Sequence, residues 1–149
     1  MILNRQREVR VARPPLESFL RRVKRELELG RQQVTICLVS DAEMARLNQS
    51  FRRKKGPTDV LSFPSTMRRA GPVVGRGKNR SESGENLGDI AISPATARRY
   101  AKKHARTLAS EIRVLMLHGV LHLLGYDHET DRGEMDRIEQ KLRKRLGIA

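Results

Sequence analysis

The segment EIRVLMLHGVLHLL, residues 111–124, limits the fold of this chain more than any other feature. Its apolar residues lie on nearly every side of a helix, and a helix that is apolar all round is buried. We therefore predict a central helix, roughly residues 108–124, that other elements cover on most of its surface. His118 and His122 lie within this segment, and buried imidazoles need polar partners.

The remaining sequence supplies elements that can cover this helix. Apolar residues at helical spacing predict an amphipathic helix over residues 16–29. The segment 33–40 is apolar on both faces, which predicts an interior strand that buries Cys37. Further strands are predicted over 59–63 and 88–93, and further helices over 41–51, 94–104 and 131–146. The pattern indicates an α+β or α/β domain with a small sheet and helices against it.

Two serines give local signals for helix starts. Ser40 lies three residues before Glu43, which is the spacing of a capping box. Ser93 precedes Pro94, and proline is favoured at the first helical position. We therefore predict that two helices begin directly after these serines.

Residues 65–86 separate the second and third predicted strands. They are rich in Gly, Ser and Arg and show almost no apolar periodicity. We interpret them as a long, flexible, basic loop, and loops of this length are commonly functional. The loop is either a flap that contacts phosphate or a plain surface insertion.

The length of 149 residues suits one domain, and we expect residues 1–149 to form a single one. The one cysteine, Cys37, excludes an intramolecular disulfide and is typical of a reducing compartment. The first residues lack the apolar core of a signal peptide, and no run approaches the ~20 apolar residues that a membrane span requires. We expect a cytoplasmic protein without a membrane partner.

The charge of the chain indicates its class of partner. Lys and Arg total 31 against 17 Asp and Glu, which gives a formal net charge of +14. Such a charge favours a polyanion, nucleic acid before an anionic membrane. Three Phe and two Tyr are too few for an extended platform of stacked bases. Contacts should therefore be mostly to phosphate and sugar, from basic runs such as RRYAKKHAR, residues 98–106.

Three of the four histidines fall in residues 117–130. His118 and His122 are four residues apart, ~40° around a helix and ~6 Å along it, so both rings point to one place. His128 would face away on a continuing helix, but Gly125 can take a left-handed conformation that turns the chain back. Three converging imidazoles predict a metal site, most naturally for zinc, although nickel or another divalent ion could compete.

The chemistry of such a site depends on its fourth ligand. A structural zinc site is closed by four protein ligands, and the sequence offers no evident fourth. Asp127 or Glu129 could supply one, but as neighbours of His128 they fit better behind an imidazole, where they would orient it. Water at an open position would lose a proton near neutral pH, which makes hydrolysis the leading chemistry.

The histidine spacing also matches the H-x-x-x-H-x-x-G-x-x-H frame of metzincin peptidases. Those enzymes carry a glutamate directly after the first histidine, and here that position is Gly119. Without that carboxylate the usual general base of peptide hydrolysis is missing. A metallopeptidase is therefore the weaker alternative, and the basic charge favours phosphodiester chemistry.

Three segments together resemble the YbeY family of bacterial endoribonucleases, which act in ribosomal RNA maturation. HGVLHLLGYDHE, residues 118–129, resembles the family signature H-G-x-L-H-L-x-G-Y-D-H. NQSFRRKKGPTDVLSFP, residues 48–64, and LGDIAIS, residues 87–93, resemble two further blocks, in the family's order. The resemblance covers the middle and C-terminal two-thirds of the chain, and the N-terminal helix and strand fit it loosely.

The resemblance implies an α+β fold: a small mixed sheet packed with helices, whose central buried helix carries the metal ligands. It implies one zinc ion on His118, His122 and His128, and cleavage of single-stranded RNA. The implied roles are maturation of the 3′ end of 16S rRNA and ribosome quality control, with the ribosome or ribosomal proteins as partners.

Arg52 is the residue to which the resemblance assigns a catalytic or phosphate-positioning role, and its planar donor fork suits a phosphate. Arg53, beside it, stands where the family usually has glycine, and Lys55 where it often has an acidic residue. The segment 65–86 is basic where the family's is often acidic. These departures predict stronger and less selective RNA binding.

Two functions follow as alternatives. In the first, the chain is a zinc-dependent endoribonuclease, in which the metal polarises a phosphate oxygen or activates water while Arg52 binds the phosphoryl group. In the second, it is a non-catalytic assembly factor that binds ribosomal RNA, and its zinc only holds the central helix to the turn at residues 126–128.

Overall fold

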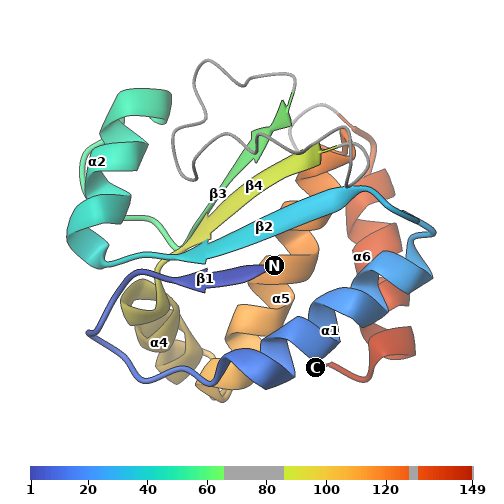
Figure 1. Ribbon diagram of the computed structural model, residues 1–149, viewed down its shortest axis with the longest axis horizontal. Helices are drawn as coiled ribbons and strands as arrows, with labels where there is room; N and C mark the ends of the chain where they lie inside the picture. Colours follow the sequence, from blue (N-terminus) through green and yellow to red (C-terminus); the bar gives the residue numbers. More distant parts are fainter. Residues whose placement is uncertain (66–85, 128–130, 149) are drawn as a thin grey trace.

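The computed structural model describes residues 1–65, 86–127 and 131–148. Within these residues the chain forms a sheet with helices around it (Figure 1). The strands are β1 (Ile2–Asn4), β2 (Gln33–Leu38), β3 (Val60–Pro64) and β4 (Asn86–Ile92). The helices are α1 (Arg13–Glu26), α2 (Asp41–Arg52), α4 (Pro94–Lys103), α5 (Leu108–Leu123) and α6 (Glu134–Leu146). This architecture confirms the α+β fold.

The four strands lie in the order β1-β2-β4-β3. β1, β2 and β4 are parallel, whereas β3 runs antiparallel to β4 at the edge of the sheet. The sheet is therefore small and mixed, as expected. Because of these directions, α2 and α4 begin at the end of the sheet where β3 also begins (Figure 1).

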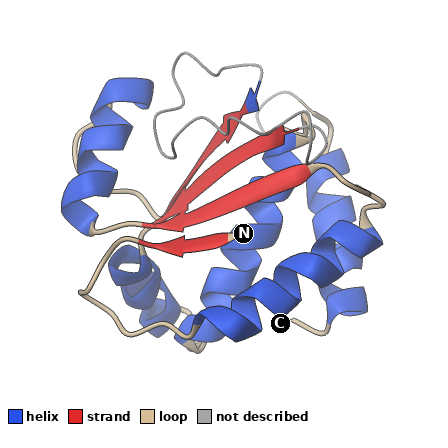
Figure 2. Cartoon of the chain, in the orientation of Figure 1, coloured by secondary structure: helices blue, strands red, loops and turns tan. Residues whose placement is uncertain are grey.

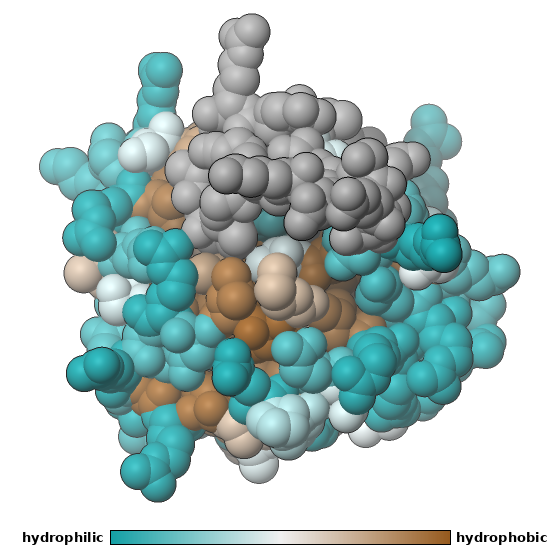
Figure 3. Space-filling view, viewed as in Figure 1, coloured by the Kyte–Doolittle hydropathy of each residue, from teal (hydrophilic) through white to brown (hydrophobic). Residues whose placement is uncertain are grey.

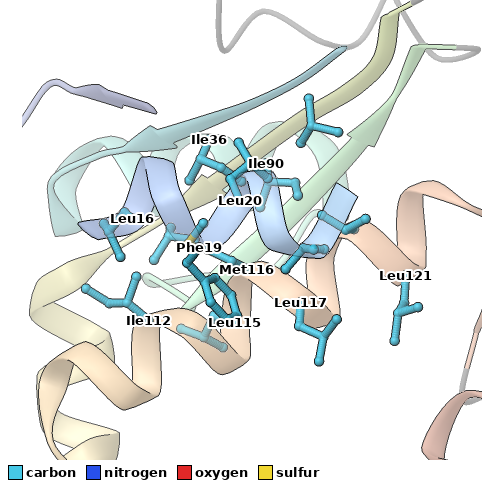
Figure 4. Close-up of a cluster of buried hydrophobic side chains, with 14 of the residues drawn as sticks. Leu16, Phe19, Leu20, Ile36, Ile90, Ile112, Leu115, Met116, Leu117 and Leu121 are labelled. Atoms are coloured by element: carbon cyan, nitrogen blue, oxygen red, sulfur yellow. The ribbon is translucent and has the colours of Figure 1, made fainter. Parts of the chain in front are cut away.

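Helices pack on both faces of this sheet (Figure 2). Ile36 and Ile90 lie in the larger hydrophobic core, with residues of α1, α5 and α6 (Figure 4). Cys37 and Ala91 face the opposite side, where they pack with Met44 of α2. Since successive side chains of a strand point to opposite faces, β2 is buried on both. This confirms the interior strand that was predicted to bury Cys37.

α5 is the predicted central buried helix. It contacts β3, β4, α1, α4 and α6. Gly119 allows α5 to lie close to the sheet, because a Cβ atom at this position would lie 2.9 Å from two side-chain carbons of Ile90. The helix therefore packs on β4 at a distance that a larger residue would not permit without a shift.

The sequence patterns did not reveal β1. This strand has three residues, too few for a recognisable alternation of side chains. It forms because its backbone pairs with β2, where the amide of Ile36 donates to the carbonyl of Met1 over 2.8 Å. Its stability is therefore a tertiary effect.

Two helices, α1 and α6, begin at other residues than predicted, and α1 also ends earlier. α1 starts at Arg13 rather than 16, because its two prolines occupy the first turn, where their missing N–H groups are not needed. It ends at Glu26 rather than 29, since Glu28 takes a positive φ of 53°. α6 starts at Glu134 rather than 131, and Asp131 instead accepts hydrogen bonds from two amides of the first turn.

Both serine signals are confirmed. The Ser40 hydroxyl accepts the Glu43 amide over 3.1 Å at the start of α2. The Ser93 hydroxyl accepts the Thr96 amide over 3.3 Å at the start of α4. These contacts are local, which is why the sequence alone predicted them.

On the face in Figure 3, hydrophilic residues surround a smaller apolar area. None of the helices in the described ranges is long and apolar enough to cross a bilayer.

Candidate metal and nucleic-acid site

The C-terminal half of α5 brings two predicted metal ligands together. The Nε2 atoms of His118 and His122 lie 3.0 Å apart, and their rings meet edge to face at 74°. Two nitrogens bound to one tetrahedral zinc ion lie about 3.3 Å apart. Both imidazoles are half-buried, so their nitrogens converge at the edge of the core. The four-residue spacing therefore brings the two rings together on one side of the helix, as predicted.

Glu139 fixes the orientation of the first of these rings. Its Oε1 atom lies 3.0 Å from Nδ1 of His118, and its other oxygen lies 3.6 Å from Nη1 of Arg143. Glu139 is on α6 and only 8% exposed. A carboxylate in this place accepts a hydrogen bond from Nδ1–H. The proton then stays on Nδ1, which leaves Nε2 with a lone pair for a metal. This is the common arrangement behind metal-bound histidines.

The turn after α5 has the expected geometry. Gly125 has a φ of 101°, which confirms the positive φ that the sequence predicted for it. Its amide donates to the carbonyl of His122 over 3.0 Å, and the amide of Tyr126 donates to that of Leu121 over 3.1 Å. This pair of hydrogen bonds is a Schellman motif, which ends the helix and reverses the chain. Asp127 follows it directly.

His128, the third predicted ligand, lies outside the described residues, as does nearly all of the predicted basic loop, 66–85 of 65–86. In residues 1–65, 86–127 and 131–148, no three His, Cys, Asp or Glu side chains converge as a metal site. The described part of the site is therefore the His118 and His122 pair, with Asp127 on the same cleft.

The histidines lie on a cleft of about 530 Å³ that runs along the edge strand β3. Arg52, the last residue of α2, lines the same cleft although it is 66 positions from His118. Among the described residues, the cleft is lined by Phe51, Arg52, Thr58, Asp59, Val60, Leu61, Ser62, Phe63, Pro64, His118, His122 and Asp127. The fold thus brings the predicted phosphate-binding arginine and two predicted metal ligands to one cavity.

The turn between α2 and β3 holds Arg52 at the cleft. Buried Asn48 donates its side-chain N–H to the main-chain carbonyl of Gly56 over 2.9 Å. The main-chain carbonyl of Asn48 accepts the amide of Lys54 over 3.3 Å. Arg53 caps the helix with a φ of 55°, in the left-handed region that favours glycine. This conformation gives a physical reason for the glycine that the sequence resemblance leads us to expect at this position.

Gly119 occupies the position at which metzincin peptidases carry their general base, and it does not line the cleft. Gly119 packs against Ile90 of β4, and its carbonyl accepts the hydroxyl of Ser62 over 3.3 Å. A glutamate here would collide with the sheet instead of reaching a metal-bound water. The close packing of α5 thus adds a steric argument against the metallopeptidase alternative.

A polar cluster joins the N-termini of α2 and α4. The carboxylate of Asp41 accepts the hydroxyls of Ser93 and Thr96, each over 2.6 Å, and lies 3.0 Å from Nη1 of Arg99. Burial raises the pKa of Asp41, but these hydrogen bonds and the charge of Arg99 outweigh it and lower the pKa below its ordinary 3.8. The cluster fixes the helix starts beside β3.

Glu139 and Asn48 are functional candidates that the sequence reasoning missed. Glu139 stands at helical spacing with the buried Met135, Leu142 and Leu146 on α6. A charged residue on the apolar face of an amphipathic helix was the available signal, since buried carboxylates need a partner. No local sequence pattern could identify His118 as that partner, because the contact joins two different helices.

The chain matches the model of the family described as Endoribonuclease YbeY over residues 1–147. A Solibacter usitatus protein named Endoribonuclease YbeY is 45% identical over 136 residues, which cover 91% of this chain and 80% of that protein. One from Koribacter versatilis with the same name is 40% identical over 148 residues, with 99% and 86% covered. A solution structure from Thermotoga maritima has a TM-score of 0.62 at 28% identity and covers 98% of this chain and 89% of that one.

Proposed function

Because this chain belongs to the Endoribonuclease YbeY family, we propose that it is a metal-dependent endoribonuclease for single-stranded RNA, with the cleft along β3 as its active site. The observation that carries the proposal is the shared cleft of Arg52, His118 and His122. An arginine and a cation site on one cavity suit the charged transition state of phosphodiester hydrolysis. The net charge of +14 favours binding of the polyanionic substrate.

In this proposal His118, His122 and His128 hold one divalent cation, zinc in preference to nickel. An all-imidazole donor set suits zinc, and three protein ligands leave a position open for water or substrate. Glu139 keeps His118 in the tautomer that presents Nε2, and Asp127 orients a neighbouring imidazole. When bound, the cation would supply a Lewis acid for a phosphate oxygen and lower the pKa of bound water.

Arg52 holds the scissile phosphate in the proposed reaction. It is exposed at the end of α2 and lines the cleft. Its guanidinium can donate two parallel hydrogen bonds to phosphate oxygens, and its charge opposes the negative charge that builds as the bond breaks. The hydrogen bond from Asn48 to Gly56 closes the turn that follows the end of α2, where Arg52 stands.

The biological substrate we propose is ribosomal RNA, with the 3′ end of 16S rRNA as the processed site and a further role in ribosome quality control in the cytoplasm. The family resemblance and the basic charge support this assignment. Ribosomal proteins would then be partners, and residues 1–149 would act as one domain with the basic loop 65–86 on the RNA.

The second candidate is a non-catalytic assembly factor that binds ribosomal RNA. Two observations favour it: Gly119 leaves no carboxylate next to the first histidine, and Glu139 ties that histidine to α6. In this candidate the metal would only hold α5 to the turn that follows it. The two candidates differ in whether RNA is cut.

Cleavage and binding of one end-labelled single-stranded RNA separate them. The test compares wild-type protein with His118→Ala, each checked for folding by circular dichroism and for bound metal by elemental analysis. The endoribonuclease proposal predicts cleavage by wild type, and retained RNA binding without cleavage by His118→Ala. Binding without cleavage by metal-loaded wild type would favour the assembly factor, and equal cleavage by both proteins would contradict the proposed site.

A further inference from the structure

A second hollow, of about 270 Å³, lies outside the cleft of the histidines. It is lined by Pro57, Thr96, Arg99, Tyr100 and Lys103. Four of these residues come from α4, at positions i, i+3, i+4 and i+7, so they share one side of the helix. Pro57 comes from the turn before β3. We call this hollow the Tyr100 subsite.

The Tyr100 subsite adjoins the cleft through one short piece of backbone. Pro57 lines the subsite and the next residue, Thr58, lines the cleft. Consecutive Cα atoms are about 3.8 Å apart, so the two cavities lie on either side of the same turn. The amide of Ser93 donates to the carbonyl of Asp59 over 3.0 Å, which fixes this turn against the start of α4. A strand that leaves the cleft at Thr58 therefore reaches α4 directly.

The Tyr100 subsite combines an aromatic ring with cationic side chains. Tyr100 is 40% exposed, one of three large hydrophobic side chains exposed among the described residues. Lys103, almost one turn further along α4, is exposed as well. An aromatic ring that stacks on a base, next to cations that contact phosphate, is the usual combination in proteins that bind single strands.

Arg99 is held in place at the rim of this subsite. Its Nη1 atom lies 3.0 Å from the Asp41 carboxylate, and its Nη2 donates to the Thr96 hydroxyl over 2.9 Å. The side chain is nevertheless 59% exposed. A guanidinium has five N–H donors, so these contacts fix its plane and leave donors directed to solvent.

We propose that the Tyr100 subsite binds one nucleotide of the RNA strand whose scissile phosphate lies in the cleft. The base stacks on Tyr100, and Lys103 and Arg99 contact its phosphate. This inference rests on the proposed function, because it takes RNA as the substrate. It adds one base-stacking position to a surface that otherwise binds phosphate and sugar, and it sets the direction in which the strand leaves the cleft.

The test measures binding of a fluorescein-labelled, unstructured RNA of about 16 nucleotides by anisotropy, a length at the upper end of the site sizes of small single-strand-binding domains. Tyr100→Ala removes the ring, and Tyr100→Phe keeps it. Lys103→Ala removes a cation of the subsite, and Lys102→Ala removes its exposed neighbour, which does not line the hollow. All are surface changes, and each variant is checked for an unchanged melting temperature.

We expect Tyr100→Ala to weaken binding roughly five- to hundredfold and Tyr100→Phe to stay within about twofold. Lys103→Ala should reduce the slope of log K against log salt concentration by about 0.7, and Lys102→Ala should reduce it by less. Equal binding by wild type and Tyr100→Ala would overturn the subsite.

Cleavage of the same RNA separates this inference from the proposed function. If Tyr100→Ala weakens binding but wild type does not cut, the subsite stands and the enzyme proposal falls. If wild type cuts and Tyr100→Ala binds and cuts as well as wild type, the subsite alone is overturned. A wild-type protein that does not bind RNA overturns both.

Discussion

Oε1 of Glu139 lies 3.0 Å from Nδ1 of His118, across the interface between α6 and α5. The two residues are 21 positions apart in the sequence. His118 is half-buried and Glu139 is buried. This contact determines which nitrogen of the imidazole faces the cleft. It also makes the proposed cation site depend on a helix that contributes no ligand of its own.

Glu139→Gln should therefore weaken metal binding without unfolding the protein. Loss of a carboxylate behind a metal-bound histidine typically lowers metal affinity about 10- to 100-fold. The affinity is measured by competition with a chromophoric chelator, which does not require RNA cleavage. Asp136→Asn, an exposed change on the same helix, serves as the matched control, and equal affinities for the two variants would contradict the role of Glu139.

Gly119→Ala should destabilise the fold, because its Cβ atom would lie 2.9 Å from two carbons of Ile90. Overpacking of this kind costs about 1–3 kcal/mol in the free energy of unfolding, measured by urea denaturation. Ile90→Val removes one of these two carbons, so the double variant should lose less than the sum of the single changes. Simple additivity would mean that the contact does not limit the packing of α5 on β4.

Arg53→Gly should stabilise the protein, since Arg53 has a φ of 55°. Removing the strain of the left-handed backbone raises the free energy of unfolding by roughly 1–2 kcal/mol. Glycine also makes the unfolded chain more flexible, which lowers the free energy of unfolding by roughly 0.4–1 kcal/mol. The net gain should therefore lie between zero and roughly 1.6 kcal/mol in chemical denaturation. Arg53→Ala removes the same charge but keeps the strain, so a gain of equal size in both variants would point to charge instead.

Asp41 should make stability depend on pH in the acidic range. Its pKa is lowered in the fold because the hydrogen bonds from Ser93, Thr96 and Arg99 outweigh the opposing effect of burial. The stabilisation is therefore complete above the ordinary pKa of 3.8 and is lost as the pH falls through the folded value. Asp41→Asn should be less stable than wild type at neutral pH, and the difference should shrink below about pH 4.

Thermal denaturation at a series of pH values checks this prediction. Glu28→Gln removes an exposed carboxylate elsewhere and controls for the change in net charge. The prediction would be contradicted if the difference in melting temperature between Asp41→Asn and wild type stayed constant down to strongly acidic pH. The Asp41 cluster would then not act through its charge.

The sequence predicted those features that depend on neighbouring residues. Ser40 and Ser93 cap their helices, and Gly125 ends α5 with a positive φ, because each acts within a few residues of itself. The four-residue spacing of His118 and His122 likewise needs only the geometry of one helix. The all-round apolar pattern of α5 was enough to place it at the centre.

What the sequence could not predict depends on distant contacts. β1 forms because its backbone pairs with β2, as in the hydrogen bond from Ile36 to Met1. Glu139 orients a histidine only because it contacts His118 on another helix. Arg52 looks the same as Arg53 in the sequence, and only the turn held by Asn48 separates the residue on the cleft from the residue that caps the helix. The family resemblance singled out Arg52 where local patterns did not.

The central claim is that Arg52 and the histidines of α5 form one RNA-cutting site. The most direct test is the single-turnover rate of cleavage of an end-labelled single-stranded RNA by wild type, Arg52→Ala and Arg53→Ala. These neighbouring arginines are both exposed, but only Arg52 lines the cleft. We predict that Arg52→Ala lowers the rate about 100- to 1,000-fold, as expected for loss of one transition-state donor, and that Arg53→Ala stays close to wild type. Equal rates for the two variants would contradict the claim.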